Sequence, residues 1–270
     1  MIDPRLLDAV GDFLLSRLNE NRPALIGIAG SQGSGKSTLA KALAEKLGGV
    51  ALSLDDVYLR RAQRQALGAD IHPLFVTRGP PLTHDLSLLD QVLDDLMSAD
   101  DHSRTALPRF DKLADDREDG SKWPLFIGRP RFIILEGWCL GAHPQPAEHL
   151  LKPVNAMEAD QDADRVWRTA INQALDGDYA KLTARLEGLV FLRAPSFEKV
   201  LDWRSQQEAG LMRLDRISSG RRAELSDFIA RFERLSRWMM NGGIGADLTI
   251  DLDEARCVLA MTYEEPISET

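Results

Sequence analysis

Residues 24–37 read ALIGIAGSQGSGKS, and this stretch decides the fold class. Its first six residues form a short apolar run, typical of a strand that is buried on both faces of a sheet. Its last eight, Gly30 to Ser37, match the pattern G-x-x-x-x-G-K-[ST]. A helical pattern from about Lys36 to Lys46 follows. The motif therefore lies between a strand and a helix, as a phosphate-binding loop requires.

The chemistry of this loop follows from its glycines and its polar residues. Glycines let the backbone bend so that successive N–H groups point at phosphate oxygens, and the helix N-terminus adds a favourable dipole. We expect Lys36 to reach the β- and γ-phosphates of a nucleotide and the Ser37 hydroxyl to ligate Mg²⁺. The predicted nucleotide-binding residues are Gly30, Ser31, Gln32, Gly33, Ser34, Gly35, Lys36, Ser37 and Thr38. The alternative is a glycine-rich turn that binds nothing.

The other apolar runs predict a sheet around this loop. Further strands are expected at residues 50–54, 132–135, 189–192 and 248–250. Helices are expected at residues 4–19, 85–98, 163–175, 196–209 and 223–240. Alternating strands and helices predict an α/β fold, here a P-loop NTPase-type parallel sheet of about five strands with helices on both faces. We expect residues 1–270 to form a single domain.

Two segments lie outside this alternation. Residues 60–84 and 101–130 are rich in Pro, Arg, Asp and His and have few periodic apolar positions. Loops of this length inside a compact domain are usually functional or disordered. Because both segments follow strand ends, where ligands bind in α/β sheets, we expect them to be substrate-side insertions.

Composition and charge exclude several classes of protein. Hydrophobic residues make up 44% and charged residues 28%, which is ordinary globular usage. The net charge of −9 opposes binding along nucleic acid or on an anionic membrane, and no run approaches the roughly 20 apolar residues of a membrane span. Cys139 and Cys257 lack metal-ligand spacing, and the N-terminus lacks a secretory pattern. We expect a cytoplasmic protein and leave its oligomeric state open.

Two carboxylates follow the second predicted strand, at the same sheet edge as the phosphate loop. Phosphoryl transfer to an alcohol needs an acceptor for the hydroxyl proton, and Asp55 is our candidate base. The alternative is an Asx turn that caps the strand end, which suits Asp56 better than Asp55. Tyr58 is a candidate contact to the acceptor, although a core position would suit it as well.

Other residues complete the candidate phosphoryl-transfer site. Glu136 ends the third predicted strand, where it could hold or orient the magnesium shell; it could also be a solvated strand-end carboxylate. N-K-x-D, the guanine-reading element of switch GTPases, occurs nowhere in the chain. Arg204 lies in the helical pattern after the fourth strand, where many small P-loop kinases carry a lid, and could steady charge on the transferred phosphoryl. A surface helix position would explain it equally well.

Basic residues in the two insertions suggest an anionic acceptor. Arg78 and His84 lie in the first insertion, and Arg109 and Lys112 in the second. Arginine forks bind carboxylates with two parallel hydrogen bonds, so Arg109 is the first candidate for a carboxylate partner. A solvated surface is an equally good interpretation for any single one of these residues.

Several motifs together resemble one family. They are residues 30–37, 53–58, 78–79 with 83–85, 108–112 (PRFDK), 136–139 (EGWC), 203–204 with 207–208, and 232–235. The set resembles the D-glycerate 3-kinase family of plants, fungi and bacteria, which is related to uridine kinase, phosphoribulokinase and bacterial pantothenate kinase. The resemblance spans residues 24 to about 250. PRFDK and EGWC are far more restrictive than the phosphate loop, which the whole superfamily shares.

The resemblance implies an ATP- and Mg²⁺-dependent kinase that converts D-glycerate to 3-phosphoglycerate. Lys36 and Ser37 would keep their superfamily roles, Asp55 matches the base of related kinases, and Glu136 matches their strand-end acid. The acceptor contacts are not assigned by the resemblance, so Arg78, His84, Arg109 and Lys112 remain candidates. Two alternatives stay open: a kinase for another small alcohol, such as a nucleoside, pantothenate or a sugar acid, and a regulatory ATPase without a small acceptor.

Overall fold

A six-stranded sheet organises the chain, and its strand order is β10-β9-β8-β1-β7-β2. The computed structural model describes residues 2–19 and 21–264. The strands are β1 (Ala24–Gly30), β2 (Val50–Ser53), β7 (Phe132–Gly137), β8 (Gly188–Arg193), β9 (Leu248–Leu252) and β10 (Val258–Tyr263). The first five pair in parallel, as the sequence predicts. The phosphate loop follows β1, which is buried along its whole length between β7 and β8.

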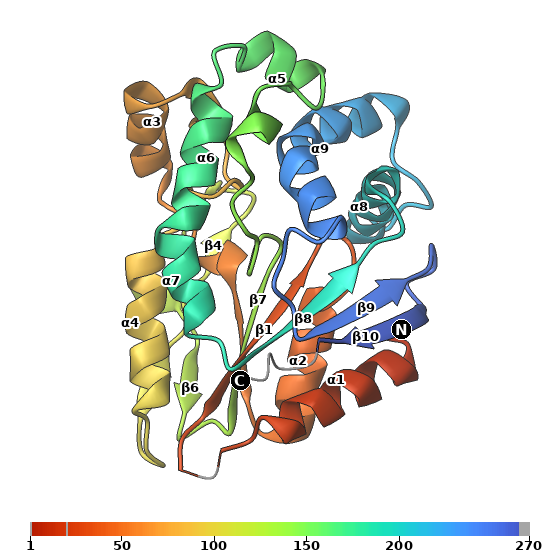
Figure 1. Ribbon diagram of the computed structural model, residues 1–270. Coiled ribbons are helices and arrows are strands. Elements are labelled where there is room, and N and C mark those ends of the chain that lie inside the picture. Colours follow the sequence, from red (N-terminus) through yellow and green to blue (C-terminus); the bar gives the residue numbers. More distant parts are fainter. Residues whose placement is uncertain (1, 20, 265–270) are drawn as a thin grey trace, which may run out of the picture.

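Helices cover both faces of the sheet (Figure 1). Alternate residues of β1 separate the two cores: Ala24, Ile26 and Ile28 pack with α1 (Pro4–Ser16) and α2 (Lys36–Leu47). Leu25 and Ala29 pack with α4 (Leu86–Met97), α6 (Val166–Asp176) and α7 (Asp178–Ala184). Burial on both faces explains why β1 is uniformly apolar. The predicted α/β fold is confirmed.

Four more helices lie beyond the carboxyl ends of the parallel strands (Figure 1). They are α3 (Arg61–Asp70), α5 (Ala156–Gln161), α8 (Phe197–Leu211) and α9 (Ser219–Met240). Ligands of open parallel sheets bind at this end. None of the helices within residues 2–19 and 21–264 combines the length and apolar character needed to cross a membrane.

The structure corrects several sequence-based boundaries. The sheet has a sixth strand, β10, which pairs antiparallel with β9 and buries only Val258, so it has no apolar alternation to reveal it. The strand expected at 50–54 stops at Ser53, because a 3₁₀ turn, η1 (Leu54–Val57), begins there. The helix expected at 4–19 ends at Ser16, and the one expected at 223–240 begins at Ser219.

The two insertions contain more regular structure than the sequence suggests. Residues 60–84 include α3 and a 3₁₀ turn, η2 (Pro73–Val76). Residues 101–130 form two small antiparallel pairs: β3 (Arg104–Ala106) with β6 (Leu125–Ile127), and β4 (Phe110–Asp111) with β5 (Asp116–Arg117). The β4–β5 pair and its turn form a hairpin, residues 110–117, that reaches the phosphate-loop end of the sheet.

Candidate active site

A pocket of about 140 Å³ joins the phosphate loop to the β4–β5 hairpin. Its nucleotide side is lined by Gln32, Gly33, Gly35, Lys36, Ser37 and Thr38, and its far side by Asp55, Tyr58, Arg78, Lys112, Trp138, Arg204, Gln207, Phe228 and Phe232. Three larger clefts, of about 670, 830 and 490 Å³, lie beside α8 and α9 and include no phosphate-loop residue. The smaller pocket is therefore the candidate active site because of the residues that line it, and not because of its size.

The phosphate loop has the backbone that anion binding requires. Gly33 and Gly35 have φ of 78° and 94°, in the left-handed region that favours glycine. A Cβ on Gly35 would meet nothing within 4 Å, so a ligand can approach the backbone there. Ser31 and Ser34 are buried, and their hydroxyls lack a hydrogen-bond partner among the described residues. Phosphate oxygens are the acceptors that would satisfy them.

A metal site fits beside this loop. Glu136, at the end of β7, is 5% exposed, and its Oε1 accepts a hydrogen bond from the Ser37 hydroxyl at 2.8 Å. Its Oε2 lies 3.8 Å from Lys36 Nζ. A carboxylate and a hydroxyl next to a phosphate cradle are the oxygen donors that Mg²⁺ takes in nucleotide sites. Ser37 and Glu136 could therefore hold the ion, and Lys36 lies next to these two residues.

Asp55 lies opposite the loop, in the turn η1 that follows β2. Its Oδ1 accepts a hydrogen bond from the Tyr58 hydroxyl, and its Oδ2 accepts one from Lys112 Nζ, both at 2.8 Å. Burial favours the neutral carboxyl, but the positive charges of Lys112 and Lys36 outweigh it and hold the pKa of Asp55 well below its ordinary value. Asp55 is therefore ionised and faces the pocket.

Asp56 has a different environment. Its Oδ2 pairs with Arg109 at 2.8 Å, and its Oδ1 accepts the Phe110 backbone N–H at 3.3 Å. Burial raises the pKa of Asp56, and Arg109 opposes the rise. These contacts fasten η1 to the start of the hairpin. Among the described residues, neither Asp56 nor Arg109 lines the pocket. The Arg109 guanidinium, which the sequence suggested as the partner of the acceptor carboxylate, binds the carboxylate of Asp56 instead.

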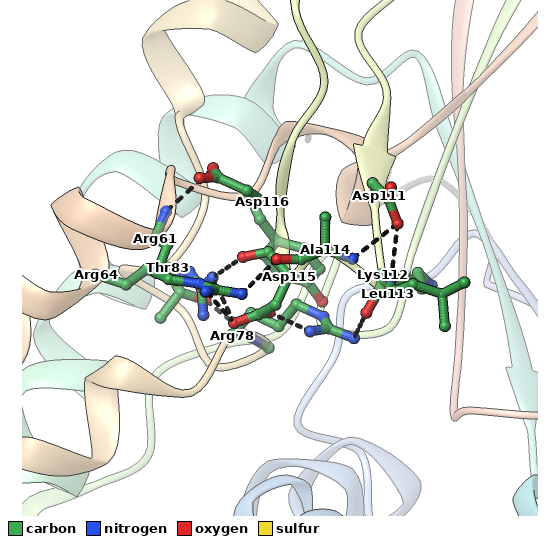
Figure 2. A network of polar contacts seen from close by, with 12 residues as sticks. Arg61, Arg64, Arg78, Thr83, Asp111, Lys112, Leu113, Ala114, Asp115 and Asp116 are labelled. Carbon is green, nitrogen blue, oxygen red and sulfur yellow. Dashed lines mark hydrogen bonds and ion pairs between the residues drawn. The ribbon is translucent and has the colours of Figure 1, made fainter.

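Arg78 lines the pocket and also holds the hairpin. Its guanidinium pairs with Asp115 in the hairpin turn, where Arg64 of α3 also binds, and it lies over the Phe110 ring with 5.4 Å to the ring centroid. Figure 2 shows the two guanidinium groups converging on Asp115. One guanidinium nitrogen of Arg78 reaches the Lys112 carbonyl at 3.5 Å. The arginine therefore helps to fix the backbone that carries Lys112.

His84 lies behind the pocket instead of on its surface. Its ring stacks on Tyr58 with 4.6 Å between ring centroids, and its Nδ1 lies 2.5 Å from the Tyr179 hydroxyl. The side chain is 5% exposed and does not line the pocket. Its contacts position Tyr58, which in turn holds Asp55.

Arg204 and Tyr58 both line the pocket. Arg204, on α8, faces the phosphate loop across the pocket and donates a hydrogen bond to Gln207 at 2.9 Å. Gly33 packs against the same helix, since a Cβ there would lie 2.7 Å from Trp203 Cβ. Tyr58 lies on the far side of the pocket from the phosphate loop, with Asp55.

One wall of the pocket was not assigned from the sequence. Trp138, Phe228 and Phe232 form an apolar surface: Trp138 meets Phe232 edge-on at 4.8 Å between ring centroids, and its indole N–H binds the Gly79 carbonyl at 2.9 Å. Phe228 and Phe232 are four residues apart on α9, a spacing that places them on one helix face. That spacing is the signal that sequence reasoning could have used.

The chain is similar to several known proteins, most of them named as kinases. The Zeta toxin family model matches residues 12–70. The chain is 34% identical over 207 residues to the uncharacterized kinase mug58 of Schizosaccharomyces pombe, covering 71% of this chain and 72% of that protein. It is 30% identical over 256 residues to the chloroplastic D-glycerate 3-kinase of Arabidopsis thaliana, covering 87% of this chain and 53% of that one.

Solved structures share the fold. The D-glycerate 3-kinase of Cryptococcus neoformans var. grubii superposes with a TM-score of 0.77 at 24% identity, over 96% of this chain and 99% of that chain. The YGR205w protein gives a TM-score of 0.68 at 24% identity, over 95% and 97%.

Fold, phosphate loop and relatives together define a P-loop kinase that acts on a small molecule. Within that class, the chain belongs to the D-glycerate 3-kinase-like family.

Proposed function

We propose that this kinase transfers the γ-phosphoryl group of ATP, with Mg²⁺, to the 3-hydroxyl of D-glycerate and so gives 3-phosphoglycerate. One observation carries the proposal. The pocket next to the phosphate loop is lined by four cationic side chains, Lys36, Arg78, Lys112 and Arg204, and by one carboxylate, Asp55. In a chain of net charge −9 such a cluster is a local exception, and it suits an anionic nucleotide together with an anionic acceptor.

The residues have distinct roles in this proposal. The phosphate loop and Lys36 bind the β- and γ-phosphates, and Arg204 neutralises charge on the transferred group. Ser37 and Glu136 would hold Mg²⁺, which when bound neutralises phosphate charge. Asp55 takes the proton from the acceptor hydroxyl as the new O–P bond forms.

The acceptor lies between the phosphate loop and the hairpin. Lys112 and Arg78 are the cations next to Asp55 that line the pocket, so they bind the acceptor carboxylate. The pocket, of about 140 Å³ including its phosphate-loop side, favours a small acceptor over a large one. The similarity to the D-glycerate 3-kinases of Arabidopsis and Cryptococcus supports D-glycerate as that acceptor.

An acceptor screen tests the proposal. Purified protein is given ATP and Mg²⁺ with D-glycerate, uridine, pantothenate or gluconate, while ADP release is followed and products are identified by ³¹P NMR. We expect fast turnover with D-glycerate and a phosphomonoester at its 3-position. Phosphorylation of uridine or pantothenate without glycerate would replace the substrate but keep the kinase. A basal ATPase rate that no acceptor changes would favour a regulatory ATPase.

Two further points belong to the same proposal. The chain acts as one kinase domain, with residues 60–84 and 101–130 as its acceptor-side insertions, which the contact of the hairpin with Asp55 supports. It works in the cytoplasm, and fluorescence microscopy of a tagged chain in its own cells would test that location.

A further inference from the structure

Both oxygens of Asp55 are engaged. Oδ1 accepts a hydrogen bond from Tyr58 and Oδ2 accepts one from the Lys112 ammonium, each at 2.8 Å. The two partners differ in kind: Tyr58 is buried and neutral, while the Lys112 side chain is charged and 55% exposed. Lys112 can therefore move away through side-chain rotation alone, whereas Tyr58 is packed in place.

The backbone that presents Lys112 is held firmly. At its base, Arg109 and the Phe110 N–H both bind Asp56. At its turn, Asp115 pairs with Arg64, whose side chain is 1% exposed. With its base and turn tied down, the hairpin delivers the Lys112 ammonium to Asp55 reproducibly.

Lys112 also faces the pocket that the acceptor would fill. The charged groups that act on Asp55 from the packed elements are Lys36 from the phosphate loop and Lys112 from the hairpin. Lys36 also serves the nucleotide phosphates. Lys112 is thus the cation whose contact with the base the acceptor can change.

We infer that Lys112 acts as a latch on Asp55. The Lys112 ammonium binds the Asp55 carboxylate and restrains this base while the acceptor site is empty, and the carboxylate of an incoming acceptor draws the ammonium away. The inference rests on the proposed function, because it takes Asp55 as the base. It adds a selection rule: a neutral alcohol of the same size does not release the latch. It also predicts slow hydrolysis of ATP in the absence of an acceptor, since water alone brings no negative charge.

The chemistry of the two reactions differs only in the nucleophile. In transfer, the acceptor oxygen bonds to the γ-phosphorus, the bond from that phosphorus to the bridging oxygen of ADP breaks, and Asp55 takes the hydroxyl proton. In hydrolysis, water replaces the acceptor and the products are ADP and inorganic phosphate. An ammonium bound to Asp55 makes it a weaker base for both. A carboxylate bound to Lys112 lifts that restraint, and the hydroxyl of a bound substrate then takes the place of the attacking water.

The test measures ATP hydrolysis without acceptor. Lys112→Met keeps the length of the side chain and removes the charge; we expect it to hydrolyse ATP about tenfold faster than wild type, since a charged hydrogen bond to the base is lost. Its D-glycerate kinase rate should fall, because the carboxylate contact is lost as well. Opposite changes in the two rates are the signature, since a merely structural role would lower both.

Matched variants complete the experiment. Lys112→Arg keeps a cation near Asp55 and should hydrolyse ATP more slowly than Lys112→Met. Lys122→Met removes an exposed lysine of the same insertion and should behave as wild type. Adding Asp55→Asn to Lys112→Met should abolish the gain. An unchanged or lower hydrolysis rate in Lys112→Met, or a gain that survives Asp55→Asn, overturns the latch.

A second measurement uses the wild-type enzyme. Lactate carries the carboxylate of glycerate but lacks its 3-hydroxyl, and 1,2-propanediol is its neutral counterpart. Lactate should raise the rate of ATP hydrolysis and 1,2-propanediol should not; equal effects of the two would contradict the latch. Absence of D-glycerate phosphorylation would remove the proposed substrate, while the acceptor-free comparison of Lys112→Met with wild type would still decide the latch.

Discussion

The nucleotide half and the acceptor half of the pocket are built in different ways. The nucleotide half comes from nine consecutive residues, 30–38, whose backbone and glycines make the site. The acceptor half gathers Asp55, Arg78, Lys112 and Phe232 from four separate segments. Ion pairs between residues 37 to 57 positions apart hold that half in place. The reaction class thus follows from a local motif, whereas the proposed acceptor contacts depend on long-range ion pairs.

Lys36→Ala tests the nucleotide half and should have the largest effect. We expect kcat to fall by about 10³-fold, because a cation on the transferred phosphoryl is lost. The side chain faces the pocket, so the fold should persist. Steady-state kinetics and a thermal melt check both points. A wild-type rate with unchanged nucleotide affinity would show that this loop is not the phosphate site.

Asp55→Asn tests the junction of the two halves. The amide keeps the shape but cannot accept the hydroxyl proton, so kcat should fall by roughly 10²- to 10³-fold with little change in ATP affinity. Asp56→Asn is the matched control, and its effect should be milder because Asp56 serves the hairpin. Greater sensitivity of Asp56 would reverse the assignment of the base. A large loss of ATP affinity in Asp55→Asn would indicate metal binding instead.

Arg78→Ala tests the acceptor half. It removes a pocket cation and an anchor of the hairpin, so KM for D-glycerate should rise by roughly 10- to 100-fold while KM for ATP stays nearly constant. The Arg109 side chain pairs with Asp56, so Arg109→Ala should raise the KM for D-glycerate less. If Arg109→Ala has the larger effect on this KM, the Arg109 guanidinium binds the carboxylate of D-glycerate, as the sequence alone suggested.

The smallest effect concerns stability and His84. Burial lowers the pKa of His84 to about 4, with the charge of Asp55 opposing the shift. The unfolded chain therefore binds more protons at this histidine between pH 6.5 and 4, and the stability of the folded state falls as the pH falls through that range. His84→Gln does not titrate, so wild type should lose about 2 kcal/mol more than this variant between pH 7 and pH 5. Urea denaturation at both pH values checks this; identical losses would mean that His84 is not buried as a neutral ring.

The same contrast explains what the sequence could and could not predict. The parallel sheet, the phosphate loop and the places of Ser37, Asp55 and Glu136 follow from local pattern, because strand ends and glycine turns are encoded within a few residues. Helix α3 was missed because its buried side chain is Arg64, a residue that usually lies at the surface. That arginine is buried because it bonds the carbonyls of Val76 and Asp115, and these contacts span up to 51 positions.

The limit of prediction from the sequence is clearest for the residues on the acceptor side of the pocket. The sequence places Arg78, His84, Arg109 and Lys112 in two insertions, but nothing local distinguishes them. Only the folded chain pairs Arg109 with Asp56, places His84 behind Tyr58, and leaves Arg78 and Lys112 on the pocket.

The most direct test of the account compares D-glycerate with glycerol as acceptors for the wild-type enzyme. The two differ only in that a carboxylate replaces a hydroxymethyl group, so their ratio of kcat/KM measures what the acceptor half recognises. If the pocket cations bind the carboxylate, D-glycerate should be preferred by at least about 100-fold. A ratio near one would contradict the claim that these ion-paired segments define an anionic acceptor site.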